Sequence, residues 1–170
     1  PVGPTGPEGP AGAAGAQGPV GPTGPTGPAG EAPAVSALYT VAPDGQTPAA
    51  AGAALVFPTD QVLLGTSVSH AAGTGAVTLN DAGTYEVLYT SDAAAANGTT
   101  PPVVASLQLN SNGTQVPGSL STATAETAEQ TVPLSNSALI TVTGATTLEL
   151  VANNTDATFS NASLMVRRIS

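Results

Sequence analysis

The side chains that could carry out chemistry are few and scattered. His70 is the only histidine, and the chain has neither cysteine nor lysine. Nucleophilic catalysis needs a base beside its nucleophile, whereas His70 stands in a stretch of alternating apolar and polar residues, which is typical of a solvent-facing or hydrogen-bonded strand histidine. Hydrolase or Schiff-base chemistry would have to be built from carboxylates. We therefore assign no catalytic residue and expect that the chain is not an enzyme.

The carboxylates stand singly rather than in the pairs that acid–base catalysis uses. Glu86 and Glu149 fall on expected strands, and the aspartates fall mostly where turns are expected: Asp44, Asp60, Asp81, Asp92 and Asp156. An aspartate in a turn usually hydrogen-bonds the turn backbone. A calcium site needs several converging oxygens, and no EF-hand or similar loop is present. We predict no cofactor and no metal ligand, although a threefold axis could supply three copies of one carboxylate.

Four asparagines match the N-glycosylation pattern Asn-X-Ser/Thr: Asn97, Asn112, Asn153 and Asn161. Asn-Gly is also an ordinary turn sequence, and such matches arise by chance in a chain rich in asparagine and threonine. We interpret these positions as turns.

Glycine occupies every third position of the first thirty residues. The ten glycines are Gly3, Gly6, Gly9, Gly12, Gly15, Gly18, Gly21, Gly24, Gly27 and Gly30. Three polyproline-like strands can wind together only if every third residue lacks a side chain, because that residue faces a crowded axis. A flexible linker would scatter its glycines over all three frames. The period therefore predicts a collagen-like triple-helical stalk over residues 1–32, and hence three chains.

The stalk threonines Thr5, Thr23 and Thr26 each complete a Gly-Pro-Thr triplet, so their hydroxyls should point outward. Two interpretations stay open: threonine is simply tolerated there, or each hydroxyl is an O-glycosylation site, as Thr/Pro-rich stalks suggest. The stalk has no proline at 12–17, where it should be softest, and only Glu8 and Glu31 are charged. We expect the register of the three chains to come from the rest of the molecule.

The charge balance excludes several partners. The net charge is -9, with Arg167 and Arg168 as the only basic residues besides His70. Binding to nucleic acid or to an anionic membrane needs clustered Lys and Arg, and no apolar run approaches the ~20 residues that cross a bilayer. We predict no nucleic-acid partner and no membrane insertion. The chain opens within a triplet, so we expect a leader or further collagen-like sequence upstream.

Residues 33–170 are long enough for one domain and carry the pattern of short strands. Alternation and turn residues predict strands at 35–42, 53–57, 62–70, 77–79, 84–91, 103–109, 114–116, 119–131, 138–143, 147–152 and 162–169, with 93–100 as a loop. Roughly ten short strands without a helical stripe indicate an all-β sandwich or jelly roll. We therefore predict that residues 33–170 form a β jelly-roll head that trimerises.

The expected core is poor in aromatic residues, with Tyr39, Phe57, Tyr85, Tyr89 and Phe159 as its five members. Small side chains bury little apolar surface, which stabilises a fold by about 25 cal/mol per Å². We expect a lone head to be marginal and to bury an apolar flank against two further copies.

The stalk together with three head segments resembles the spore-surface collagen-like glycoproteins of the BclA type, with a head similar to the trimeric jelly rolls of tumour-necrosis-factor (TNF) and complement domains. The segments are 82–87 (AGTYEV), 106–118 (SLQLNSNGTQVPG) and 162–169 (ASLMVRRI). The resemblance implies a bacterial homotrimer at the tip of a filament on the exosporium, with sugars on Thr5, Thr23 and Thr26. The family's attachment leader is not matched here.

We therefore expect a structural surface protein that associates with itself. The alternative is an adhesin or receptor-binding tip, as in phage fibres, whose partners would be surface glycans or host receptors. An aromatic-lined groove at an exposed end of the head would favour that alternative.

Overall fold

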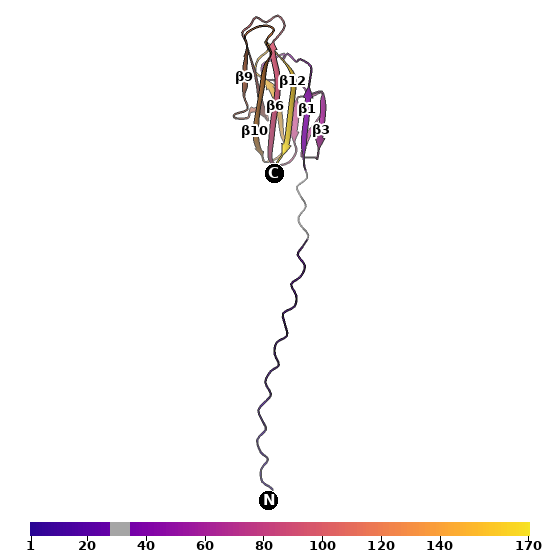
Figure 1. Ribbon diagram of the computed structural model, residues 1–170, viewed down its shortest axis with the longest axis vertical. Helices are drawn as coiled ribbons and strands as arrows, with labels where there is room; N and C mark the ends of the chain where they lie inside the picture. The colour runs from indigo at the N-terminus through magenta and orange to yellow at the C-terminus, as the bar shows by residue number, and fades with distance from the viewer. Residues whose placement is uncertain (28–34) are drawn as a thin grey trace. The chain divides into compact units, whose positions relative to one another are not determined.

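The computed structural model describes residues 1–27 and 35–170. The chain divides into two units, Pro1–Ala32 and Pro33–Ser170. Gly30 and the predicted boundary after residue 32 fall outside the described residues. Residues 1–27 form an exposed, extended chain in which no residue is assigned to a helix or strand (Figure 1).

The second unit, which we call the head, is a sandwich of two antiparallel sheets (Figure 1). Sheet A has the order β10-β6-β12-β1-β3, with β1 (Ala37–Ala42), β3 (Thr59–Leu64), β6 (Gly83–Ala95), β10 (Val132–Val142) and β12 (Ala157–Arg168). Sheet B has the order β4-β5-β11-β7-β8, with β2 and β9 paired to β11 and β7. Its strands are β2 (Ala53–Ala54), β4 (Val68–His70), β5 (Ala76–Leu79), β7 (Val103–Ser111), β8 (Thr114–Gln115), β9 (Ser121–Ala125) and β11 (Thr146–Ala152). The described residues contain no helix long and apolar enough to cross a membrane.

The core lies between the two sheets and follows the alternation of each strand. In β6, Tyr85, Val87 and Tyr89 are fully buried, as the sequence predicts. The largest buried side chains from other elements are Phe57, Phe159, Leu38, Leu55, Leu79, Leu107, Leu109, Leu134, Leu148 and Leu150. Leucine therefore supplies most of the bulk in an aromatic-poor core. The prediction was wrong for Tyr39, whose ring is not in this core but points outward and is 39% exposed.

Two predicted strand boundaries were wrong because strand pairing extends further than the local pattern. The predicted loop 93–100 begins too early, because Ala93–Ala95 continue β6, with Ala93 fully buried. β6 is held there by β12 on one side, and Ala93 also by β10 on the other. Alanine has a weak preference for strands, but pairing outweighs that preference. β10 likewise begins at Val132, before the expected 138.

The stretch 62–70, predicted as one strand, is two strands in different sheets. β3 ends at Leu64, Gly65 turns the chain, and β4 begins at Val68 in sheet B. Gly65 has φ +70°, and a Cβ there would clash with the Ser36 hydroxyl oxygen. Only glycine fits this corner, since a side chain would clash and the backbone is left-handed.

The strand at 162–169 is longer than predicted because a β-bulge interrupts its pattern. β12 begins at Ala157, and its register against β6 shifts between Ser160 and Ser163. Asn161, inside the bulge, has φ 49°. Its amide nitrogen Nδ2 donates to the Asp92 carboxylate at 2.9 Å. Bulges re-aim the side chains around them, so the simple alternation is lost over these residues.

The hairpin predicted around 110–113 forms between β7 and β8. Asn112 and Gly113 have positive φ values of 48° and 77°, as a two-residue turn of this kind requires. The Asn112 side-chain oxygen accepts a hydrogen bond from the Thr147 amide at 2.9 Å. The turn is thus tied to β11 as well as to its own arms.

Candidate assembly surfaces

The outer face of sheet A carries a row of apolar side chains across four neighbouring strands. Leu88 of β6 lies opposite Met165 of β12, Met165 opposite Tyr39 of β1, and Tyr39 opposite Val62 of β3. We call these four residues the apolar row. Leu88, Tyr39 and Val62 are 38%, 39% and 40% exposed. A contiguous apolar strip on an otherwise polar surface marks an interaction site more often than scattered exposed residues do.

The next row of the same face combines charge with apolar side chains. Arg167 of β12 pairs with Glu86 of β6, with Nη2 to Oε2 at 2.6 Å, and both groups are solvent-accessible. Leu139 of β10 lies opposite Glu86, and Leu64 of β3 lies opposite Ala37 of β1, at the two ends of this row. An exposed ion pair contributes little stability by itself. Its two charges instead give this face a defined electrostatic pattern.

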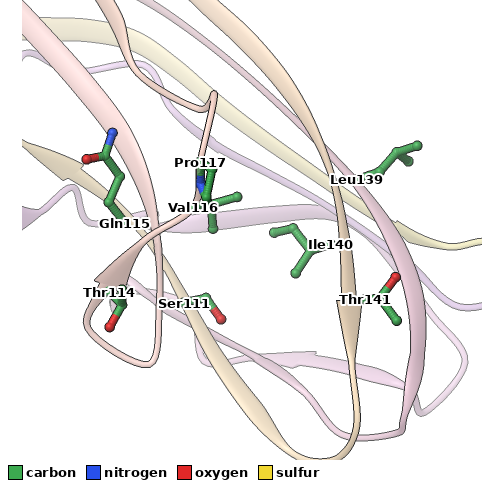
Figure 2. A pocket seen from close by; sticks show the side chains of 8 residues that line it. All are labelled: Ser111, Thr114, Gln115, Val116, Pro117, Leu139, Ile140 and Thr141. Carbon is green, nitrogen blue, oxygen red and sulfur yellow. The ribbon is translucent and has the colours of Figure 1, made fainter.

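A second surface lies where the β7–β8 hairpin faces the edge strand β10. It is a groove of about 360 Å³ lined by Ser111, Thr114, Gln115, Val116, Pro117, Leu139, Ile140 and Thr141. We call it the edge groove. Figure 2 shows the side chains of Val116 and Ile140 directed toward each other across its floor, whereas Leu139 points away from that floor. Leu139 is 68% exposed. The lining has hydroxyl and amide groups but no charged side chain.

Two buried tyrosines connect the sheets beneath these surfaces. The Tyr89 hydroxyl donates to the carbonyls of Leu107 at 3.1 Å and Ser119 at 2.7 Å. Burial raises the pKa of Tyr89 to about 12. Burial also raises the pKa of Tyr85, whose hydroxyl donates to the Asp81 carbonyl at 2.9 Å. Both phenols have a structural role, because backbone carbonyls accept the hydrogen bonds of their hydroxyls.

The predicted stalk residues lie in the extended unit. Thr5, Thr23 and Thr26 are exposed. A Cβ added at any of the nine described glycines, Gly3 to Gly27, would meet no atom within 4 Å, and none of them has a left-handed backbone. Gly30 is not described.

The histidine and carboxylates take different places from those the sequence suggested. Asp60 and Asp92 lie on strands β3 and β6 rather than in turns. His70 is the hydrogen-bonded strand histidine that was expected, since its ring contacts Asp60 and the Thr74 carbonyl. Among the residues described, no group of three or more His, Asp or Glu is placed to hold a metal ion. Asn161 lies in the β12 bulge and not in a turn, against the interpretation of the four Asn-X-Ser/Thr matches as turns.

No family model matches the sequence, and no curated protein matches it either. Solved structures do. Mouse APRIL, crystallised at pH 8.0, superimposes with a TM-score of 0.60 at 11% identity, over 79% of this chain and 99% of that one. The globular domain of zebrafish complement 1qA superimposes with a TM-score of 0.58 at 9% identity, over 79% and 95% of the two chains. The head is a jelly roll of the TNF and C1q type. At such low sequence identities, the structural similarity establishes the fold of the head and nothing about its function.

The sequence predicted an apolar flank on the jelly roll but not its position. In β1, residues 37, 39 and 41 look as apolar as their neighbours, yet Leu38, Thr40 and Ala42 are the buried set. No local signal separates Tyr39 from the buried Tyr85 and Tyr89, whose hydroxyls find backbone carbonyls as partners. The edge groove gave no local signal, since its two walls are about 25 residues apart in the chain.

Proposed function

We propose that this chain is the subunit of a homotrimeric surface filament protein, in which the jelly-roll head trimerises and registers a collagen-like stalk of residues 1–32. The observation that carries the proposal is the glycine period. Glycine is usually required where the backbone is left-handed or where a neighbouring atom leaves no room for a Cβ. Neither reason applies at the nine described stalk glycines within a single chain. A crowded axis shared by three chains supplies the missing reason.

The two surfaces of the head are suited to a ring of three. The sheet A face and the edge groove are unlike each other, so a contact between them is head-to-tail rather than two-fold symmetric. Repeated contacts of that kind close into a ring when the rotation between copies fits. In such a ring each apolar row, around Leu88 and Tyr39, packs against the edge of the next copy, around Leu139. A threefold ring also brings three stalks to a common axis.

Assembly of the head raises the effective concentration of the stalks. The stalk itself contains only Glu8 and Glu31 as charged residues, so ion pairs between its chains are too few to set their register. In our proposal the triple helix therefore zips from the head end toward residue 1. The role is structural, and no step in it is catalytic.

The proposed setting is the outer surface of a bacterial cell or spore, with the exosporium as the specific case suggested by the BclA-type resemblance. Thr5, Thr23 and Thr26 are the proposed O-glycosylation sites. Their exposure in the extended unit is compatible with modification. Mass spectrometry of the stalk from native material tests this part by itself.

A refolding experiment tests the proposal that the head nucleates the triple helix of the stalk. The full chain and a peptide of residues 1–32 are denatured, and the polyproline-type circular dichroism signal is followed after dilution. We expect the full chain to recover a cooperative triple-helix signal faster and at lower concentration than the peptide. Equal rates at matched stalk concentration would show that the head does not nucleate the stalk.

A glycan-binding tip is the second candidate, and one observation favours it. Tyr39, the exposed aromatic of the described head, lines a shallow pocket of about 240 Å³ with Pro43, Asn161 and the hydrogen-bonded hydroxyls of Thr90 and Ser163. Sugars stack on aromatic rings and bond such polar groups. Screening the full chain on a glycan array, with Tyr39→Ala as the control, distinguishes the candidates. Binding that Tyr39→Ala abolishes, in a variant whose mass in solution is unchanged, would support the tip, and no binding would leave the filament subunit.

A further inference from the structure

His70 and Asp60 form an ion pair that links the two sheets at one side of the sandwich. Asp60 is on β3, at the end of sheet A, and His70 is the last residue of β4, at the end of sheet B. His70 Nδ1 lies 2.6 Å from Asp60 Oδ1. The His70 side chain is fully buried and that of Asp60 is 17% exposed. The pair therefore connects two edge strands in a site that is largely shielded from water.

The second ring nitrogen of His70 also faces an acceptor. His70 Nε2 lies 3.1 Å from the Thr74 carbonyl oxygen, which in turn accepts the Phe57 amide at 2.9 Å. A neutral imidazole carries one N–H and one bare nitrogen, whereas an imidazolium donates from both. A neutral ring would leave a lone pair directed at either the carboxylate or the carbonyl. Only the protonated ring satisfies both contacts.

β3 has few other side-chain ties to the rest of the head. Asp60 is the one residue of β3 that is not exposed. Otherwise the strand is held by backbone pairing to β1 on one side and by the Thr40 hydroxyl, which donates to the Thr59 carbonyl at 3.0 Å. The His70 ring contacts Asp60 on β3 and the Thr74 carbonyl in the 71–74 turn, and so it joins the strand to this turn. Loss of the ring proton would thus remove the side-chain link between this end of the edge strand and sheet B.

The surroundings contain few other charges that could replace this pair. β5 places the buried Val77 beside His70. Glu149, beside Ala76 on β11, alternates with the buried Leu148 and Leu150 and so lies on the outer face of sheet B. Arg168 of β12 contacts Ser67 and Asp81 beyond the opposite end of β4. Asp60 is therefore the ionisable partner that faces the ring.

We propose that His70 and Asp60 form a pH-sensitive clasp that fixes the edge strand β3 to sheet B while the imidazole is protonated. The stabilisation is present while the folded chain holds the proton and is lost as rising pH removes it. β3 also carries Val62 and Leu64 on the proposed assembly face, so alkaline loosening should weaken assembly as well. That last consequence rests on the proposed function, whereas the clasp does not.

The chain offers an unusually clean test, because His70 is its only histidine and it has no cysteine. Histidine is the side chain whose charge normally changes between about pH 5 and 8. With ¹⁵N-histidine labelling, nitrogen NMR of the full chain reports the ring without assignment work. We expect both ring nitrogens to be protonated at the acidic end of the titration. We also expect the thermal midpoint to fall by several degrees over the interval in which one proton leaves.

Two variants separate the clasp from general charge effects. Asp60→Asn keeps an acceptor but removes the negative charge, and it should lower the thermal midpoint and abolish its pH-dependent step. Asp44→Asn removes an equal charge from an exposed position and should retain the wild-type step. A ring with one bare nitrogen throughout the titration would overturn the proposal, as would a step that survives in Asp60→Asn. If Asp60→Asn fails to fold, the wild-type NMR titration alone decides.

A clasp observed in a chain that stays monomeric at every pH would refute the proposed trimer and leave the clasp standing.

Discussion

The Tyr89 hydroxyl donates a 2.7 Å hydrogen bond to the Ser119 carbonyl and so ties β6 of sheet A to the loop that precedes β9 of sheet B. The same hydroxyl reaches the Leu107 carbonyl of β7. Tyr89→Phe removes both bonds without changing the shape of the ring. Because two buried carbonyls lose a donor, we expect a loss of about 1–3 kcal/mol in unfolding free energy, measured by denaturant titration. Tyr39→Phe, at the partly exposed ring, should change it by less than about 0.5 kcal/mol; equal effects would contradict this assignment.

Tyr89 also predicts how the head responds to alkali. Burial raises its pKa to about 12 in the folded chain, from 10.0 when exposed. The unfolded chain therefore loses the phenolic proton first, and the contribution of Tyr89 to stability is complete below pH 10 and is lost between pH 10 and about 12. Thermal midpoints across this interval should fall more steeply for the wild type than for Tyr89→Phe. Parallel curves for the two proteins would refute the prediction.

Leu139 offers a direct test of the assembly surfaces. Its side chain is 68% exposed in the single chain, so Leu139→Asp should change the folding of one head very little. In the proposed ring the same aspartate would be buried against the next copy, where an unpaired charge is costly. We expect Leu139→Asp to lower the trimer fraction at least tenfold at micromolar concentration, by analytical ultracentrifugation, while the far-ultraviolet circular dichroism stays that of a β-sandwich.

Val104→Asp is the matched control for that experiment. Val104 is 53% exposed and lies on β7 of sheet B, away from the apolar row. The substitution introduces the same charge in place of an exposed aliphatic side chain. Retention of the trimer in Val104→Asp and its loss in Leu139→Asp would support the sheet A face and edge groove. Loss in both, or in Val104→Asp alone, would place the interface elsewhere.

A single stalk glycine tests the triple helix. Within one chain a Cβ at Gly15 would meet no atom within 4 Å, so Gly15→Ala has no effect on an isolated extended chain. At the axis of a triple helix there is no space for that methyl group. We expect the stalk's circular dichroism transition to shift several degrees lower, with the head transition unchanged. Ala14→Ser, at the outward third position of the preceding triplet, should leave both transitions in place.

The hairpin asparagine separates backbone strain from a side-chain bond. Asn112 has φ 48° and accepts a hydrogen bond from the Thr147 amide at 2.9 Å. Asn112→Gly removes the bond but suits the left-handed backbone, whereas Asn112→Ala removes the bond and adds strain of roughly 1 kcal/mol. We expect Ala to be the more destabilising change in denaturant titration. The reverse order would show that the turn does not hold this geometry in solution.

Much of the jelly roll could be predicted from the sequence because its central strands alternate cleanly. Tyr85, Val87 and Tyr89 gave β6 and its buried face directly. The predicted strand boundaries were wrong where strand pairing or a bulge outweighed the local alternation of apolar and polar residues, as at Ala93–Ala95 in β6 and at Asn161 in β12. The prediction was also wrong at the Gly65 corner, because the nine-residue stretch 62–70 gives no sign that its two halves belong to different sheets.

The candidate surfaces were less predictable than the fold, since they depend on which strands become neighbours. The apolar row combines Leu88, Met165, Tyr39 and Val62 from four strands, and no short window contains two of them. The His70–Asp60 pair was hidden for the same reason, because it joins strands of opposite sheets. The predicted stalk is the opposite case. Its glycine period is strictly local, so the prediction of partner chains needs no knowledge of the fold.

The native mass in solution tests the central claim most directly. Light scattering or native mass spectrometry on the full chain at neutral pH should give about 49 kDa, three times the 16.3 kDa of one chain, with no concentration dependence in the micromolar range. A stable species of one or two chains under those conditions would contradict the account, because a collagen-like stalk cannot wind from fewer than three.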